Sequence, residues 1–241
     1  MINTQKQGLL MTAKNKDIFA CDKEDFYIVE YKDTAVSRHG LKRGTIFGKG
    51  AINNRISAFL MGIMHSHGIP TAFVEKLSSN ESLIKKITPL PLSVVVRNLA
   101  AGSLSKTLGI KEGTRLKQPV VELHLREESL HDPLINDSHA IALELCTREE
   151  LDSLYEYSLR VNEILCEHLK RLDVLLVDFG LDFCRDMQGQ ILLSYEISPD
   201  TCRFWDSKTG ECLDHDRFCL DLGDAEDAYE EIARRILGKG L

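Results

Sequence analysis

The segment that decides the fold reads Leu90-Pro91-Leu92-Ser93-Val94-Val95-Val96-Arg97-Asn98-Leu99-Ala100-Ala101-Gly102-Ser103-Leu104-Ser105-Lys106-Thr107-Leu108-Gly109. Its β-branched run after a proline predicts a buried strand that ends at Arg97. A short helix is expected next, with Ser103 as N-cap and Gly109 in the left-handed position after the last turn. Because helix N-termini attract anions, Arg97, Gly102 and Ser103 form a candidate anion-binding corner. A plain strand-to-helix corner with a surface arginine is the alternative.

Length, composition, cysteine content and net charge exclude several classes of protein. With 241 residues, 43% hydrophobic and 28% charged, the chain is predicted to be one large globular domain or two packed lobes. No apolar run approaches the roughly 20 residues that cross a bilayer, so we expect a cytoplasmic protein without membrane contact. Its seven scattered cysteines argue for reduced thiols and against a zinc site. A net charge of −7 gives no support to nucleic-acid binding.

The first third of the chain predicts a small mixed lobe of short strands and one helix. Residues 9–19 are expected to form a strand that carries Lys14 and Lys16 on one face, where they could reach a polyphosphate or remain a solvated face. Residues 40–50, which hold four glycines and several cations, predict a basic mobile loop. Residues 51–67 have a helical apolar period that Gly68 ends.

Beyond the opening segment, a strand over 119–125 leads into a polar loop. That loop, residues 130–139, holds two histidines, two aspartates and an asparagine around Pro133. It is typical of an active-site loop, although ordinary turn chemistry explains the same residues. Thr147 and Glu150 then predict a capping box that opens the longest helix, which should end near Leu172.

Two further strands are predicted over residues 174–179 and 190–197, joined by a hairpin-like connection at 186–189. Paired in this way, they would bring Asp178 and Asp182 near Glu196 and Asp200. Oxygen ligands of this kind suit Mg²⁺, so the sequence predicts an acidic cluster able to hold that ion. A closing helix is expected over 224–237.

Several segments together resemble one family, the SAICAR synthetases (phosphoribosylaminoimidazole-succinocarboxamide synthases) of purine biosynthesis. The matching segments are Val94–Lys106, Leu130–Pro133, Leu176–Phe179 and Ile197–Arg203, and the likeness covers nearly the whole chain in order. The resemblance implies an α+β protein with a two-lobed ATP-binding fold, antiparallel sheets and flanking helices. Its expected division is a β-rich N-terminal lobe over 1–90 and an α+β lobe over 91–241, with the nucleotide cleft between them.

The resemblance also implies an activity and assigns residues to it. It implies an ATP-dependent ligase that uses Mg²⁺ and joins L-aspartate to the carboxylate of the ribotide CAIR through an acyl phosphate. The implied partners are these small molecules, and homo-oligomer formation stays open. The implied site residues are Lys14, Lys16 and Lys86 for ATP, Arg97, Ser103 and Arg203 for the ribotide, Asp178, His131 and Asp132 for catalysis, and Asp182 and Glu196 for the metal.

The sequence departs from the family pattern at three further positions that the family uses for its substrates or its metal. Gly180 stands where the family has a lysine, Tyr195 replaces the acid expected before Glu196, and Cys219 replaces an arginine. These changes support an alternative hypothesis, a diverged homologue that binds a purine-type ribotide but has lost or changed the ATP-driven ligation. Arg38, His39 and Arg126 are candidate cations to replace those lost.

Overall fold

The computed structural model describes residues 2, 4–37 and 40–238, so Arg38 and His39 lie outside the described residues. The first sheet is antiparallel, in the order β1 (Lys6–Thr12), β2 (Lys16–Cys21), β3 (Phe26–Tyr31), β7 (Glu81–Lys85) and β6 (Phe73–Lys76). Helix α1 (Lys49–Ser66) packs against it. A separate small sheet pairs β4 (Thr34–Val36) with β5 (Arg43–Thr45).

The second sheet is also antiparallel. Its order is β10 (Leu134–Ile135), β9 (Arg115–Leu125), β8 (Thr88–Leu99), β11 (Val174–Arg185) and β12 (Ile191–Leu193), with β13 (Cys202–Asp206) beside β11. The remaining helices are α2 (Gly102–Leu108), α3 (Asp137–Ala142), α4 (Arg148–Lys170), α5 (Asp216–Cys219) and α6 (Ala225–Leu237), with a 3₁₀ turn at Glu128–Leu130. The predicted α+β class with antiparallel sheets and flanking helices is confirmed.

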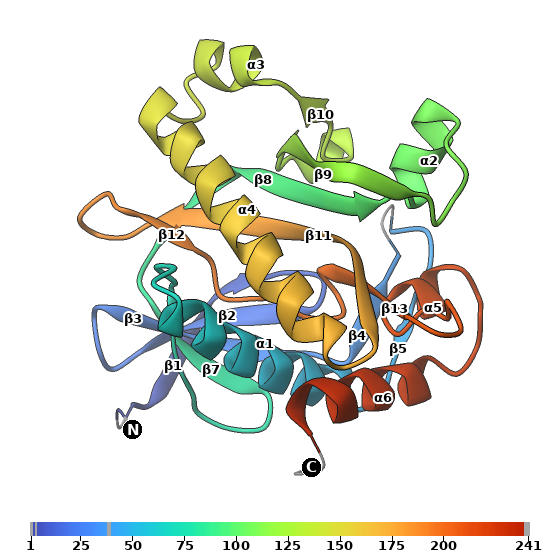
Figure 1. Cartoon of the computed structure of the whole chain (residues 1–241). Helices are drawn as coiled ribbons and strands as arrows, with labels where there is room; N and C mark the ends of the chain where they lie inside the picture. The colour runs from blue at the N-terminus through green and yellow to red at the C-terminus, as the bar shows by residue number, and fades with distance from the viewer. Residues whose placement is uncertain (1, 3, 38–39, 239–241) are drawn as a thin grey trace.

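The second sheet separates an apolar layer from a charged one. Figure 1 shows α4 crossing one face of this sheet diagonally, with α1 and α6 side by side below it. Since strand side chains alternate between faces, Leu92, Val94 and Val96 of β8 face this helical layer and are buried in the main core. Arg97 and the strand residues in register with it therefore lie on the opposite face.

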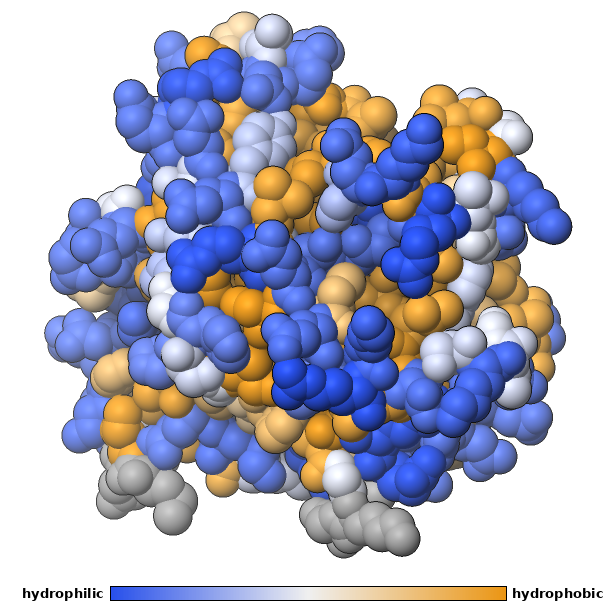
Figure 2. All heavy atoms as spheres, in the orientation of Figure 1, coloured by the Kyte–Doolittle hydropathy of each residue, from blue (hydrophilic) through white to orange (hydrophobic). Residues whose placement is uncertain are grey.

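The outer surface of the chain is mostly polar. Figure 2 shows hydrophilic side chains over most of the visible face, with apolar atoms in separate patches, one of them over α2 at the upper right. No helix among the described residues is both long and apolar enough to span a membrane.

The opening segment folds nearly as predicted, with two corrections. Strand β8 does not end at Arg97 but continues to Leu99. Helix α2 begins at Gly102 after Ala101, so Ser103 is not the N-cap; its hydroxyl instead accepts a hydrogen bond from the Arg97 guanidinium at 2.9 Å. Gly109 takes the predicted left-handed conformation with φ of 64°. The alternative of a surface arginine is wrong because Arg97 is only 1% exposed.

The prediction of one strand over residues 9–19 is wrong. The chain turns between β1 and β2, so Lys14 lies in the turn and Lys16 begins β2. The predicted mobile loop at 40–50 is wrong as well, because its described residues include β5 and the first turn of α1. Asp33 fixes that turn by accepting hydrogen bonds from the N–H groups of Gly48 and Gly50 at 3.0 and 2.8 Å.

The hairpin after α4 is confirmed, but its strands differ in length from the prediction. Strand β11 does not stop at Phe179 but continues to Arg185, and β12 spans only Ile191–Leu193. Glu196 therefore lies in the segment after β12, outside the sheet.

The two-lobe division at residue 90 stays an interpretation. The chain passes from the first sheet to the second between Lys85 and Thr88, close to the predicted boundary. Helix α1 contributes Ile56 and Leu60 to the same core as α4 and the second sheet. The two predicted lobes thus share one hydrophobic core, to which α1 contributes.

The capping box of α4 is confirmed and gives a stability prediction. Thr147 Oγ1 accepts from the Glu150 N–H at 3.2 Å, and the Glu150 carboxylate accepts from the Thr147 N–H at 2.8 Å. We expect Thr147→Ala to lower the free energy of unfolding by about 1 kcal/mol, measured by urea denaturation. Thr107→Ala, at an exposed helix position, is the control; equal effects of the two changes would contradict the prediction.

Candidate active site

The main cleft, a hollow of about 870 Å³, lies on the charged side of the second sheet. Its walls come from the β1–β2 turn, β4, α2, the residues before β13, and α5. Among the described residues its lining includes five of the predicted site residues: Lys14, Ser103, Asp132, Asp178 and Arg203. The other six lie outside this lining: Lys16, Lys86, Arg97, His131, Asp182 and Glu196.

The floor of the main cleft is organised by one carboxylate between two arginines. Asp178 on β11 lies in register with Arg97 on β8 and with Arg203 on β13. Its Oδ2 accepts from Arg97 Nη1 at 2.9 Å and from Arg203 Nη1 at 2.5 Å. All three charges are largely removed from water, which is costly unless they are paired as they are here.

Each arginine has further partners that fix its direction. Arg97 Nη2 also pairs with Glu122 of β9 at 2.8 Å and donates to Ser103. Arg203 Nε pairs with Asp216 at the start of α5 at 2.5 Å. Burial lowers the pKa of Arg203, but Asp178 and Asp216 more than offset this and hold its pKa above the ordinary value. The Arg203 guanidinium therefore remains charged at every accessible pH.

A chain of contacts extends from this floor to the polar loop after β9. Glu122 accepts from His124 Nε2 at 3.3 Å, and His124 Nδ1 lies 3.0 Å from the Asp132 carbonyl oxygen. His131 and Asp132 both have left-handed backbones, with φ of 60° and 50°. Such conformations cost about 1–2 kcal/mol per non-glycine residue, so the surrounding contacts hold this loop in place.

A second charged centre joins the two halves of the chain at Asp200. Its Oδ2 accepts from Lys49 Nζ at 2.6 Å and from Asn15 Nδ2 at 2.7 Å, and its Oδ1 accepts from the Tyr229 hydroxyl at 2.5 Å. Although burial alone would raise the pKa of Asp200, Lys49 and the nearby His215 hold it well below the usual range. Lys49 itself is fully buried.

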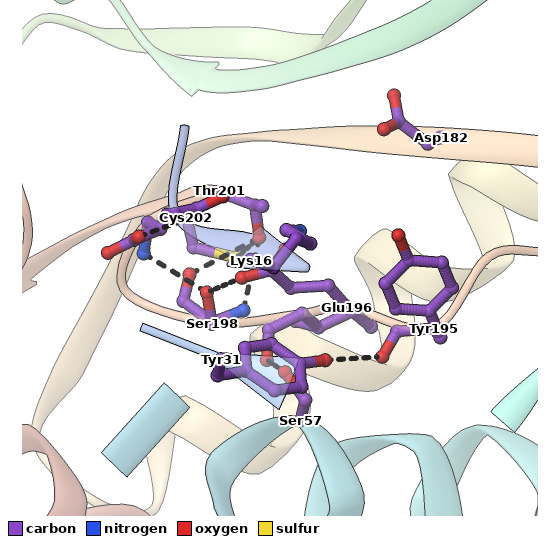
Figure 3. Close-up of polar contacts among 12 residues, drawn as sticks. Lys16, Tyr31, Ser57, Asp182, Tyr195, Glu196, Ser198, Thr201 and Cys202 are labelled. Carbon is purple, nitrogen blue, oxygen red and sulfur yellow. Dashed lines mark hydrogen bonds and ion pairs between the residues drawn. The ribbon is translucent and has the colours of Figure 1, made fainter. Parts of the chain in front are cut away.

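Lys16 and Glu196 form a neighbouring buried pair that Figure 3 shows from the side. Burial lowers the pKa of Lys16 to about 8, against the opposing charges of Asp182 and Asp200. The other Glu196 oxygen accepts from the Ser198 hydroxyl at 2.8 Å. The ammonium also lies 5.3 Å from the ring centre of Tyr195, the residue found where an acid was expected.

The four carboxylates expected to form one acidic cluster do not do so. Asp178 and Asp200 each pair with cations of their own, as described above, and Asp182 pairs with Arg126 at 3.2 Å. Figure 3 shows the Asp182 carboxylate pointing away from the segment that carries Glu196. Within residues 2, 4–37 and 40–238, no three His, Cys, Asp or Glu side chains converge to hold a metal ion.

The remaining predicted cations lie at exposed positions. Lys14 reaches across to Glu128 in the 3₁₀ turn at 2.9 Å, with side-chain exposures of 37% and 73%. Such a pair contributes little to stability, so the Lys14 ammonium can exchange partners at small cost. Lys86 is exposed in the connection between β7 and β8.

The positions that depart from the family pattern have distinct surroundings. Gly180 lies on the charged face of β11 between Asp178 and Asp182, and an added Cβ would meet only Val95, at 4.0 Å. The backbone there does not require glycine, so a side chain would fit. Cys219 ends α5 and lines the main cleft.

Sequence reasoning missed two groups in or beside the cleft. Lys49 lies within the segment predicted to be a loop, although its place directly after Gly48 fits the start of a helix. Asp214 lines the cleft and accepts from the N–H groups of Phe204 and Asp216 at 2.7 and 2.8 Å. Burial, together with the charge of Asp216, raises the pKa of Asp214 to about 8. No sequence pattern identifies a buried acid of this kind.

Comparisons with known proteins point to one family. The sequence profile of the SAICAR synthetase family matches residues 9–236 of this chain. The phosphoribosylaminoimidazole-succinocarboxamide synthase of Caldanaerobacter subterraneus is 50% identical over 232 residues, 96% of this chain and 98% of that protein. The crystal structure of the Ehrlichia chaffeensis synthase superimposes with a TM-score of 0.94 at 38% identity, covering 97% of this chain and 100% of that one. A SAICAR synthetase solved in complex with ADP superimposes with a TM-score of 0.93 at 42% identity, covering 96% of this chain and 98% of that chain.

Gly102 gives a prediction about the floor of the cleft. Its φ is +55°, and an added Cβ would lie 3.1 Å from Arg203 Nη2. Gly102→Ala should therefore cost about 1 kcal/mol for the left-handed backbone and about 1 kcal/mol or more for displacing the guanidinium. Gly109→Ala is a matched control because its φ is +64° with no atom within 4 Å. Equal losses of unfolding free energy in the two variants would contradict the prediction.

Asp214 gives a prediction about pH. With a folded-state pKa of about 8 against an ordinary value of 3.8, the native chain keeps a proton that the unfolded chain releases. The contribution of Asp214 to stability is therefore full below about pH 4 and is lost as pH rises toward 8, at a slope on the order of 1 kcal/mol per pH unit.

Urea unfolding between pH 5 and 7.5 measures this slope. Asp214→Asn should flatten it, whatever its effect on absolute stability, whereas Asp152→Asn on the exposed side of α4 should not. An unchanged slope in the Asp214 variant would show that the group titrates normally.

Proposed function

Because the chain belongs to the SAICAR synthetase family of ATP-dependent ligases, we propose that its main cleft joins L-aspartate to the carboxylate of CAIR. The observation that carries the proposal is the Asp178 carboxylate held between Arg97 and Arg203 on the cleft floor. This arrangement offers a fixed cation and a fixed acceptor to one ligand. A ribotide presents both the anionic phosphate and the sugar hydroxyls that such a pair binds.

The ribotide is assigned to the Ser103 end of the cleft. Ser103 and Arg203 line the cleft directly, and Lys106 lies one turn further along α2 on the same wall. Arg97 is buried behind them and bonds to Ser103, Asp178 and Glu122. Its proposed role is therefore to position Ser103 and Asp178, while Arg203 and Ser103 contact the ligand.

ATP is assigned to the boundary between the two sheets, where cations gather. The exposed Lys14–Glu128 pair can open at little cost, which frees the Lys14 ammonium for phosphate oxygens. Lys16 lies close by on β2, and Lys86 lies at the connection to the second sheet. Lysines on these two segments would neutralise the negative charge of the triphosphate. The site therefore does not require a glycine-rich phosphate-binding loop.

Magnesium is proposed to enter with the nucleotide. Mg²⁺ is commonly held by one or two carboxylates together with substrate phosphates and waters, so a cage of three protein ligands is not required. Glu196 and Asp182, to which the resemblance assigns the metal, lie just outside the lining of the main cleft and have separate partners, and the donor chemistry of both fits the ion. Bound there, Mg²⁺ would neutralise charge on the triphosphate.

The proposed reaction has two steps. A CAIR carboxylate oxygen attacks the γ-phosphorus of ATP, the bond to the β–γ bridging oxygen breaks, and ADP leaves. The amine of L-aspartate attacks the acyl carbon, and the carbon–oxygen bond to phosphate breaks. The nitrogen loses one proton before attack and a second as the amide forms. Asp132 is proposed to take the first proton and the departing phosphate the second.

The ligase interpretation is preferred to the diverged homologue. Identity near 50% over almost the whole length of a curated synthase supports it, and no described contact of Gly180, Tyr195 or Cys219 specifically favours lost ligation. A cytoplasmic location is also proposed, because all seven cysteines are free thiols and suit a reducing compartment. Homo-oligomer formation stays a prediction.

The proposal predicts turnover that depends on four components. Incubation with ATP, Mg²⁺, CAIR and L-aspartate should release ADP and phosphate in equal amounts. Omission of any one, or addition of EDTA, should return ADP formation to the blank. Arg203→Met should lower kcat/KM for CAIR by on the order of a hundredfold or more, since a buried carboxylate also loses its partner.

Arg171→Met, at an exposed residue just after α4, is the matched control and should leave all constants unchanged. Absence of ADP formation in the complete mixture, with CAIR still bound in calorimetry, would overturn the ligase and favour the diverged homologue.

A further inference from the structure

The β1–β2 turn, residues 13–16, carries two of the lysines assigned to ATP, and hydrogen bonds hold its backbone. The Ala13 N–H donates to the Lys16 carbonyl at 2.8 Å, which closes the turn. Lys32, directly after β3, donates from its N–H to the Asn15 carbonyl at 2.8 Å and from its Nζ to the Ala13 carbonyl at 3.2 Å. These bonds anchor the turn to the first sheet.

A side-chain amide anchors the same turn to the second half of the chain. Asn15 Nδ2 donates to Asp200 Oδ2 at 2.7 Å, between residues 185 positions apart. Asp200 lies in the segment that joins β12 to β13, and both residues line the main cleft. The bond therefore fixes the turn against another wall of the cleft, in addition to its attachment to its own sheet.

The acceptor of this bond is itself held firmly. The Asp200 side chain is only 7% exposed. Its Oδ2 also accepts from Lys49 Nζ at 2.6 Å, and its Oδ1 accepts from the Tyr229 hydroxyl at 2.5 Å. Its N–H donates to the Ser198 hydroxyl at 3.1 Å. Because a hydrogen bond to an ionised acceptor is stronger than one between neutral groups, Asp200 is a fixed and strong anchor for Asn15.

The two lysines beside Asn15 differ in how tightly they are held. Lys16 pairs with the Glu196 carboxylate, and both side chains are largely buried (Figure 3). Lys14 pairs with Glu128 at 2.9 Å in an exposed contact that contributes little to stability. Asn15 and Lys16 thus fix the chain directly after Lys14, while the Lys14 ammonium can still change partners.

From these contacts we infer that Asn15 is a positioning residue for the nucleotide, which acts through Lys14. The inference rests on the proposed function, which assigns Lys14 to the phosphates of ATP. Because Asn15 ties the turn to Asp200 before the nucleotide arrives, it removes part of the ordering cost that binding would otherwise carry. A neutral amide serves this purpose without a charge of its own, so it neither competes with Lys14 for phosphate oxygens nor repels them.

Nucleotide binding to the full-length protein tests this role. Asn15→Ala should raise the Kd of the non-hydrolysable ATP analogue AMP-PNP, measured with Mg²⁺ by calorimetry, about tenfold. The KM for ATP should rise in parallel, and the KM for CAIR should stay unchanged. Asn80→Ala is the matched control, because it removes a partly buried amide that donates to Glu30 at 3.4 Å outside the main cleft. Unchanged nucleotide constants in Asn15→Ala, or an equal rise in the KM for CAIR, would overturn the inference.

A double-mutant cycle separates positioning from a direct contact and from general loosening of the cleft. If Asn15 acts through Lys14, Asn15→Ala should weaken AMP-PNP no further in a Lys14→Met background, so the two changes should be strongly non-additive. The same loss in both backgrounds would mean that Asn15 contacts the nucleotide itself or that the substitution loosens the whole cleft. Either meaning would contradict a role through Lys14.

Because calorimetry needs no turnover, it distinguishes failure of this inference from failure of the proposed function. Binding of AMP-PNP that Asn15→Ala weakens about tenfold, in a protein that forms no ADP from the complete mixture, would remove the ligase function alone. Normal turnover with equal AMP-PNP binding in the wild type and in Asn15→Ala would remove the role of Asn15 alone. A wild-type protein that neither binds the analogue nor turns over would remove both.

Discussion

The pairing of one buried carboxylate with two arginines constrains the whole second sheet. Asp178 accepts from Arg97 and Arg203, which come from the strands on either side of it. If either strand pairing shifted by one residue, a charged side chain would point into the apolar layer under α4, where it would have no partner. The charged floor therefore specifies the register, and the register in turn fixes the walls of the cleft.

A comparable constraint joins the two sheets. Lys49 and Lys16 come from the N-terminal part of the chain, whereas their partners Asp200 and Glu196 lie in the segment before β13. Unless a ligand supplies a new partner, neither lysine can leave its carboxylate without burying an uncompensated charge. The Lys14–Glu128 pair across the same boundary is exposed and weak. The base of the cleft is thus held by buried ion pairs, whereas the exposed Lys14–Glu128 pair can separate easily. This combination suits a site that admits a nucleotide.

The positions that depart from the family pattern do not disturb this base. Gly180 leaves open space above Val95, and Tyr195 places a ring near the Lys16 ammonium. Arg126, by contrast, supplies a cation beside Asp182 on the same face of β11. Loss of a lysine at Gly180 therefore leaves the face with a cation at a neighbouring position, although that cation has a different reach and geometry.

Local sequence patterns were enough to predict several of the secondary-structure elements. The capping box at Thr147, the left-handed Gly109 and the buried strand that leads to Arg97 all depend on neighbours within a few residues, so local pattern alone predicted them. The fold and the family were predicted from the resemblance to the synthetases. Only the tertiary structure decided how the charges pair: that Arg97 is buried, that Asp178, Asp182, Glu196 and Asp200 hold separate partners, and that Lys49 is enclosed. The physical reason is that the partner of a buried charge is chosen by proximity in space, between residues up to 180 positions apart, and no local pattern records that choice.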